Sequence, residues 1–175
     1  MREQEISYVR IDQEDYPARL REIYGPPEGL YYRGTLLRED NLAVALVGSR
    51  RCSLYGEKTA RALAKGLAER GVTVISGMAR GIDTASHEGA LEAGGRTVAV
   101  MGSGFGRIYP PESEDLLERI ASSGCVFTEY AFDTPPLKWN FPKRNRIVSG
   151  LAMGVVVVEA SARSGSLITV DFALD

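Results

Sequence analysis

The stretch LAVALVGSRRCSLYGEKTARALAKGLAERGVTVISG, residues 42–77, decides the fold. It begins with an apolar run at 42–50 that ends in a glycine turn, and an amphipathic helix is predicted over 55–71. That helix closes at Gly71, a residue suited to the left-handed conformation in which many helices end. A second strand at 72–77 follows at once. A strand, a helix and a strand in this order are typical of a parallel sheet.

The same alternation continues along the rest of the chain. The remaining elements are predicted as a helix over 83–95, a strand over 97–104, a helix over 111–124, a strand over 125–130, a helix over 143–152, a strand over 154–160 and a helix over 165–175. The strands are continuous apolar runs, as in sheets that helices cover on both faces. We therefore predict an α/β fold with a Rossmann-like, doubly wound and mostly parallel sheet.

The first 41 residues follow a different pattern, with Pro and Gly punctuation and pairs of aromatic residues. We predict a small N-terminal lead-in segment over 1–41, with a short strand near Leu30–Tyr32, ahead of a core over 42–175. The last predicted helix has neither a C-cap nor a strand after it. The core is therefore expected to be incomplete.

Composition limits the possible functions. A chain of 175 residues with 44% hydrophobic positions can bury one core, and a net charge of −2 excludes a generally basic nucleic-acid binder, so that any polyanion site must be local. Cys52 and Cys125 lie far apart, outside any metal-binding pattern, and are predicted to be buried free thiols of a reducing compartment. The apolar runs are too short to cross a bilayer, and the charged start excludes a secretory signal. We predict a cytoplasmic protein with no membrane, metal or cofactor partner.

Glycine and serine follow most of the predicted strands. Ligands of open parallel sheets bind at the carboxyl ends of the strands, and the first such end contributes Gly48, Ser49 and Arg50. The loops after three other strands also carry an arginine each, at Arg80, Arg107 and Arg163. Loop amides and arginine side chains both bind phosphate. The sequence therefore predicts a phosphate or nucleic-acid site at this edge.

Two familiar nucleotide motifs are missing from the sequence. G-x-G-x-x-G does not follow the first strand of the core, and G-x-x-x-x-G-K-[ST] does not occur. An NAD enzyme and a P-loop ATPase are therefore disfavoured.

The run PPLKWNFPKRNRIVSGLA, residues 135–152, contains the chain's single tryptophan and no acidic residue. Pro142 suits a first helical turn, so Lys143, Arg144 and Asn145 are predicted at the start of a helix. Cations there oppose the helix dipole unless an anion, such as phosphate, balances them. Trp139 and Phe141 can offer stacking faces to unpaired bases. The alternative, that both rings are core anchors, remains open.

His87, the only histidine, follows Asp83 by four residues on a predicted helix. The two can form a general acid–base pair, but an Asp83 helix cap with a neighbouring histidine is the favoured interpretation. The sequence contains neither the order of a catalytic triad nor a carboxylate dyad. We predict that the protein is not an enzyme.

Five ordered motifs together resemble the DNA-processing protein A (DprA/Smf) family, namely VALVGSRRCSLYG, VISGMARGIDTASHEGAL, GSGFGRIYPPE, NFPKRNRIVSGLA and VVEASARSGSLIT. The resemblance implies a Rossmann-like domain that binds single-stranded DNA. It also implies a role in natural transformation, in which the protein protects incoming strands and helps to load the RecA recombinase. RecA contact and a homodimer are implied as well, although in this family both depend on segments after the last of these motifs.

The resemblance also implies roles for individual residues. Arg50 matches a DNA-contacting arginine, Lys138 a phosphate-contacting lysine and Phe141 a base-contacting aromatic. By motif position, the same pocket includes Lys143, Arg144, Asn145, Ser164, Gly165 and Ser166.

Two other functions stay open. The wider superfamily of this fold contains nucleotide-processing enzymes, so a small-nucleotide sensor or nucleotide hydrolase is the first alternative; the P-G-G-x-G-T loop of those enzymes is missing here. The second alternative is an interaction scaffold whose glycine loops serve only as turns.

Overall fold

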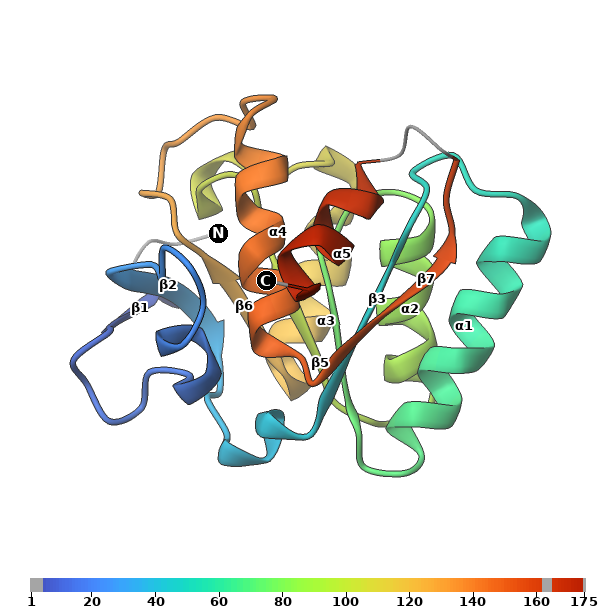
Figure 1. Ribbon diagram of the computed structural model, residues 1–175, viewed down its shortest axis with the longest axis horizontal. Coiled ribbons are helices and arrows are strands. Elements are labelled where there is room, and N and C mark those ends of the chain that lie inside the picture. Colours follow the sequence, from blue (N-terminus) through green and yellow to red (C-terminus); the bar gives the residue numbers. More distant parts are fainter. Residues whose placement is uncertain (1–4, 162–164, 175) are drawn as a thin grey trace.

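A seven-stranded sheet runs through the computed structural model, which describes residues 5–161 and 165–174 (Figure 1). The strand order is β1-β2-β6-β5-β4-β3-β7. The strands are β1 (Ser7–Arg10), β2 (Gly29–Gly34), β3 (Ala43–Gly48), β4 (Thr73–Ser76), β5 (Thr97–Val100), β6 (Cys125–Thr128) and β7 (Gly154–Glu159). The five strands from β3 to β7 are parallel, whereas β1 and β2 are antiparallel to their neighbours. The predicted α/β fold is confirmed.

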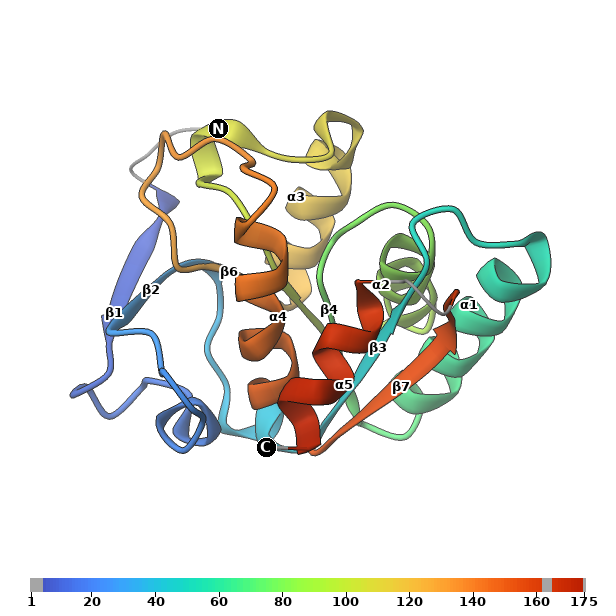
Figure 2. The same cartoon turned by 45° about the horizontal axis from the view of Figure 1, so that its top comes forward.

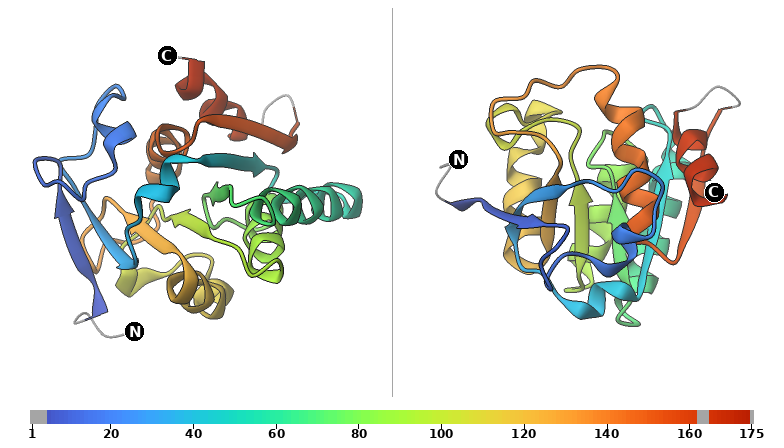
Figure 3. Two further views of the ribbon diagram at one scale, coloured as in Figure 1. Left: turned by 90° about the horizontal axis from the view of Figure 1, so that it is seen from below. Right: turned by 60° about the vertical axis from the view of Figure 1, so that its left-hand side comes forward.

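Helices cover both faces of the sheet. The helices are α1 (Leu54–Ala68), α2 (Ile82–Glu92), α3 (Glu114–Ser123), α4 (Asn140–Leu151) and α5 (Ser166–Leu174). Figure 3 shows α1, α2 and α3 on one face and α4 with α5 on the other. Within the described ranges, no helix is both long and apolar enough to cross a bilayer.

The core lies on both sides of the sheet because successive residues of a strand point to opposite faces. In β5, Val98 packs in the cluster that contains Ile147 of α4, whereas Ala99 packs in the cluster that contains Leu117 of α3. This double burial explains the uninterrupted apolar runs of the central strands.

The lead-in contributes to the same sheet. β2 pairs with β6 in antiparallel register, with Tyr31 opposite Thr128, and β1 pairs with β2. The strand predicted near Leu30–Tyr32 therefore lies within β2, while β1 was not predicted. Tyr16 Oη donates a hydrogen bond of 2.8 Å to the carbonyl of Pro27, which closes the segment between these strands. The division into parts at residue 41 stays a prediction.

The order of the parallel strands places a crevice beside β3. From β3 the chain adds β4, β5 and β6 in one direction, and β7 then pairs on the opposite side of β3. Ligands of doubly wound sheets bind outside the carboxyl ends of the strands at such a reversal. These ends lie at the top of Figure 1 and come forward in Figure 2, together with the first turn of α4.

Candidate nucleic-acid interface

A cleft of about 720 Å³ opens at this edge of the sheet. Its lining comes from the end of β3, from the loops after β3, β4, β6 and β7, from Tyr109, and from α2, α4 and α5. The lining residues are Val47, Gly48, Ser49, Arg50, Arg51, Gly77, Ala79, Asp83, Tyr109, Pro136, Lys138, Phe141, Pro142, Arg144, Asn145, Val148, Ser161, Gly165, Ser166 and Thr169.

Glu159, at the end of β7, holds the loop that carries Arg50. Its backbone carbonyl accepts a hydrogen bond of 2.7 Å from the Ser49 amide, and its carboxylate accepts bonds from Ser53 N at 2.8 Å and Ser53 Oγ at 2.5 Å. Ser53 is the N-cap of α1 and accepts from the amide of Gly56. The bonds from Ser53 lower the pKa of Glu159. A side-chain carboxylate therefore occupies the start of α1, where dinucleotide-binding folds place a phosphate.

Gly81 lets the loop after β4 approach the Arg50 loop. Its φ is 76°, and a Cβ built on it would overlap the carbonyl oxygen of Ser49. The next amide, of Ile82, donates to that same carbonyl at 3.2 Å. Only glycine combines this backbone conformation with so close an approach. Gly81, Ser49 and Glu159 thus fix the position of Arg50 from two sides.

Arg144 forms the floor of the cleft. Its side chain is buried, and Nη1 donates hydrogen bonds to the backbone carbonyls of Gly77 and Val100, at the ends of β4 and β5. Burial lowers the pKa of Arg144 to about 10, so the guanidinium is charged at pH 7. A Cβ on Gly77 would lie 2.7 Å from both Arg144 Nη2 and Asp83 Oδ2. The lack of a side chain at Gly77 therefore leaves room for this buried pair of opposite charges.

Asp83 does not cap its helix. The N-cap of α2 is Gly81, and Asp83 Oδ2 instead accepts a hydrogen bond of 3.2 Å from the amide of Ala79 in the preceding loop. Burial raises the pKa of Asp83, and the nearby charge of Arg144 opposes that rise. The predicted helix cap is wrong because the backbone turns sharply at Gly81 before the helix begins.

Phe141 is surrounded by three side chains. The guanidinium carbon of Arg50 lies 4.9 Å from the ring centroid and that of Arg144 lies 5.9 Å from it. The ring of Tyr109 is 5.6 Å away, centroid to centroid, at an interplanar angle of 58°. These are distances at which a cation interacts with an aromatic face and at which tilted rings attract each other. Tyr109 was not predicted as a site residue, although it follows one of the glycine loops.

Helix α4 begins at Asn140, three residues before the predicted start, so the basic residues lie beyond its first three positions. Asn140 Nδ2 donates to the carbonyl of Gly102 at 3.0 Å, which fastens the start of α4 to the loop after β5. Lys143 turns away from the cleft and pairs with Glu129 at 3.5 Å. A carboxylate of the protein therefore balances part of the positive charge of this basic run, without a bound anion.

The structure brings together most of the predicted site residues. The cleft lining includes Gly48, Ser49, Arg50, Lys138, Phe141, Arg144, Asn145, Gly165 and Ser166, and it does not include Lys143. Asn145 Nδ2 donates to the carbonyl of Gly165 at 3.3 Å, which links α4 to the start of α5. Ser164 and Arg163 lie outside the described residues.

The other two loop arginines lie outside the cleft lining. Arg80 forms an ion pair with Glu112 at 2.5 Å and stands over the ring of Tyr109, while Arg107 is exposed in a short 3₁₀ turn.

His87 is buried behind the cleft, against β5. Its Nδ1 lies 2.7 Å from Thr97 Oγ1, which itself donates to the carbonyl of Val74. Because the hydroxyl proton of Thr97 is used in that bond, His87 Nδ1 must be the donor. Burial lowers the pKa of His87 to about 3, so the ring is neutral at pH 7. His87 is absent from the cleft lining, which does not favour an acid–base pair with Asp83.

Comparison with known proteins gives one consistent family. The family model described as DNA recombination-mediator protein A matches residues 7–175. The DNA processing protein DprA of Bacillus subtilis is 40% identical over 175 residues, which cover 99% of this chain and 59% of that protein. The chain spans about half the length of the curated relatives it matches.

Two solved structures are also similar to the chain. The crystal structure of DNA processing protein A from Streptococcus pneumoniae has a TM-score of 0.90 and 44% identity, covering 98% of this chain and 60% of the other. A structure of DNA processing protein A from Helicobacter pylori, which concerns the single-stranded DNA binding mode of that protein, has a TM-score of 0.85 and 31% identity. It covers 95% of this chain and 76% of the other.

Proposed function

The chain belongs to the DNA recombination-mediator protein A family, and from this premise we propose that it binds single-stranded DNA in the cleft beside β3. The family resemblance of its motifs is confirmed by these matches. The single-stranded DNA binding mode described for the Helicobacter pylori protein supports the same ligand here.

The observation that carries the proposal is the group of cations around one aromatic ring at the carboxyl ends of the strands. Arg50 and Lys138 line the cleft, and neither forms an ion pair with a carboxylate of the described residues. The Phe141 ring, in the same cleft, lies close to the guanidinium groups of Arg50 and of the buried Arg144. Phosphates held by arginine and lysine, with bases on an aromatic ring, are the means by which proteins bind single strands without reading sequence.

The residues take different parts in this mechanism. Arg50 and Lys138 contact phosphates, and Phe141 stacks on a base. Arg144 is held by backbone carbonyls, so it contributes a fixed positive charge beneath the ligand rather than a mobile contact. Gly48, Ser49, Asn145, Gly165 and Ser166 shape the walls of the cleft.

In the cell, we propose a role in natural transformation, in which the protein protects incoming single strands and helps to load RecA. We further propose that the protein is not an enzyme, that it acts in the cytoplasm and that it contacts RecA and a second copy of itself. The family membership supports these proposals.

The test is fluorescence anisotropy of labelled oligo-dT, with duplex DNA as the comparison, at low and moderate salt. We expect a preference for the single strand and an affinity that falls with salt, with a slope that decreases by about 0.7 for each phosphate contact removed. Lys138→Ala should show that decrease. Arg38→Ala is the control, because Arg38 is exposed far from the cleft and pairs with Glu14. Equal affinity of Lys138→Ala and the unmodified chain, at both salt concentrations, would contradict the assignment.

One observation supports the alternative function of a nucleotide hydrolase. Asp83 is a buried carboxyl group in the floor of the cleft whose pKa is raised by burial, as in many general bases. Turnover of mononucleotides that is lost in Asp83→Asn would support this alternative. Unchanged mononucleotides after prolonged incubation would remove it.

A further inference from the structure

The start of α4 has two faces, and only one of them lines the cleft. At 100° per residue, Phe141, Arg144 and Val148 lie on the side that faces the cleft. Trp139, Lys143 and Arg146 are spaced i, i+4 and i+7, so they lie along the opposite side, where Trp139 and Lys143 are exposed and Arg146 is buried. We call these three residues the outer stripe.

The aromatic end of the outer stripe is exposed on a firmly held backbone. Trp139 is 68% exposed, so it is not a core anchor. Its carbonyl accepts from the Lys143 amide at 3.4 Å, and the next residue, Asn140, is buried and bonded to Gly102. Because the backbone is already fixed, only the side-chain torsions of the indole lose freedom when a flat ring stacks on it.

The outer stripe also carries positive charge. Lys143 has a side chain that is 56% exposed, and it shares the single carboxylate of Glu129 with Arg146. Two cations on one carboxylate leave a net positive charge. This charge attracts a phosphate and repels a basic protein surface.

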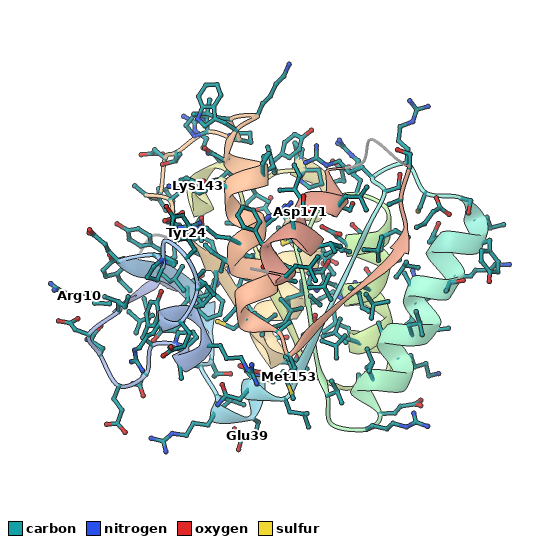
Figure 4. All side chains as sticks on the ribbon, viewed as in Figure 1. Arg10, Tyr24, Glu39, Lys143, Met153 and Asp171 are labelled. Carbon is teal, nitrogen blue, oxygen red and sulfur yellow. The ribbon has the colours of Figure 1, made fainter. Side chains whose placement is uncertain are left out.

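The outer stripe is continuous with the cleft through Lys138. Lys138 lines the cleft and is the chain neighbour of Trp139. On the other flank, Arg146 Nε donates to the carbonyl of Gly25 at 2.9 Å, next to Tyr24, which is 92% exposed. Figure 4 shows Lys143 and Tyr24 on the same side of α4.

We propose that the outer stripe is a second contact for the same single strand, in which a base that leaves the cleft stacks on Trp139 and a phosphate pairs with Lys143. The strand then passes across the start of α4, from Lys138 to Trp139. This inference rests on the proposed function of the cleft, and it adds a binding surface on the other side of the helix.

The experiment uses the full chain and its single tryptophan as the reporter. Two oligo-dT probes are compared, one of about 4 and one of about 12 nucleotides, which span the site sizes of small single-strand-binding modules. The longer probe should quench Trp139 emission, and an abasic strand of equal length should not. Trp139→Ala should weaken binding of the longer probe about tenfold and that of the shorter probe less than about twofold, while Trp139→Phe restores most of the affinity.

Lys143 provides an independent readout. Lys143→Ala should lower the salt slope by about 0.7 for the longer probe and leave the slope of the shorter probe unchanged. Tyr55→Ala, which removes an aromatic that is 79% exposed on α1, is the matched control for losing an exposed ring.

The results separate this inference from the function of the cleft. If the longer probe binds but neither quenches Trp139 nor distinguishes Trp139→Ala, the second contact is refuted and the cleft site stands. Equal losses for both probes would also refute it, because Trp139 would then belong to the first contact. If no oligonucleotide binds by anisotropy, the proposed function itself fails.

Discussion

The guanidinium of Arg50 covers one side of the Phe141 ring, 4.9 Å from its centroid. The phosphate contact and the stacking platform of the proposed site therefore bind each other in the free protein. A base can stack on that side of Phe141 only when Arg50 moves away, and the phosphate beside the base gives the guanidinium a new partner. Single strands satisfy both residues at once, whereas a free base or a free phosphate satisfies only one.

The first prediction is non-additivity between these two residues. Arg50→Ala removes a phosphate contact but also frees the Phe141 ring, and Phe141→Ala removes the stack but frees Arg50. Neither single variant has an Arg50–Phe141 contact in the free protein, so neither has to break that contact when DNA binds, as the unmodified protein must. The double variant should lose more oligo-dT affinity than the sum of the two single losses, by about 0.5–1 kcal/mol, the value of an exposed cation–π contact. Titrations of all four proteins measure this excess, and strict additivity would show that the two side chains stay stacked in the complex.

The second prediction concerns Glu159, where charge and position have opposite effects. Removing a carboxylate near a phosphate site should tighten DNA binding by electrostatics alone. Because Glu159 holds Ser53 and thereby the Arg50 loop, we expect Glu159→Ala to bind oligo-dT about fivefold more weakly, the equivalent of one net hydrogen bond. Glu159→Gln keeps an acceptor for Ser53 and should bind better than Glu159→Ala. Tighter binding by Glu159→Ala would mean that its charge, and not its position, dominates.

The third prediction is that Arg144→Ala impairs folding as well as binding. The substitution leaves the carboxyl of Asp83 buried without its opposite charge, so the free energy of unfolding should fall by about 3–5 kcal/mol. Urea unfolding measures the loss. Asp83→Asn combined with Arg144→Met should recover part of it. An Arg144→Ala protein of unchanged stability and reduced affinity would instead identify a direct phosphate contact.

The fourth prediction is a pH dependence that arises from His87. The pKa of this buried ring is lowered from 6.5 to about 3, so the unfolded chain binds a proton that the folded one does not. The stabilisation is present above pH 6.5 and is lost as the pH falls towards 3. Between pH 6.5 and 5 the free energy of unfolding should fall by about 2 kcal/mol. In His87→Asn, which retains a donor near Thr97 Oγ1, this part of the pH dependence should vanish. If the free energy of unfolding of the variant still falls between pH 6.5 and 5, carboxylates and not His87 cause the fall.

The parallel core could be predicted from the sequence because its signals are local. Apolar runs such as 72–77 and the periodic helix after Ser53 need no distant partner to be recognised. β1 escaped prediction because SYVR is short and only Val9 is buried. The start of α4 was misplaced because Asn140 is held by Gly102, a contact 38 residues away along the chain.

The site was predictable as a location but not as an arrangement. Strand ends and glycines indicate the edge of the sheet, and the basic run indicates α4. Lys143 and Arg144 are neighbours in sequence, but consecutive residues of a helix point about 100° apart. Lys143 therefore pairs with Glu129, whereas Arg144 donates to the carbonyls of Gly77 and Val100. Such partners belong to distant strands, so composition alone cannot assign them.

The pairing of β2 with β6 has a consequence for biosynthesis. Tyr31 leaves the ribosome long before Thr128, its partner in the sheet, has been made. At about 5–20 residues per second, the early strand waits on the order of 5–20 seconds for the strand that completes it. During that time Leu30, which is buried in the finished protein, lacks the core partners that are made later, such as Phe127. The lead-in is synthesised before the core and can pair with β6 only when β6 has been made, and apolar surface exposed during such a delay favours aggregation.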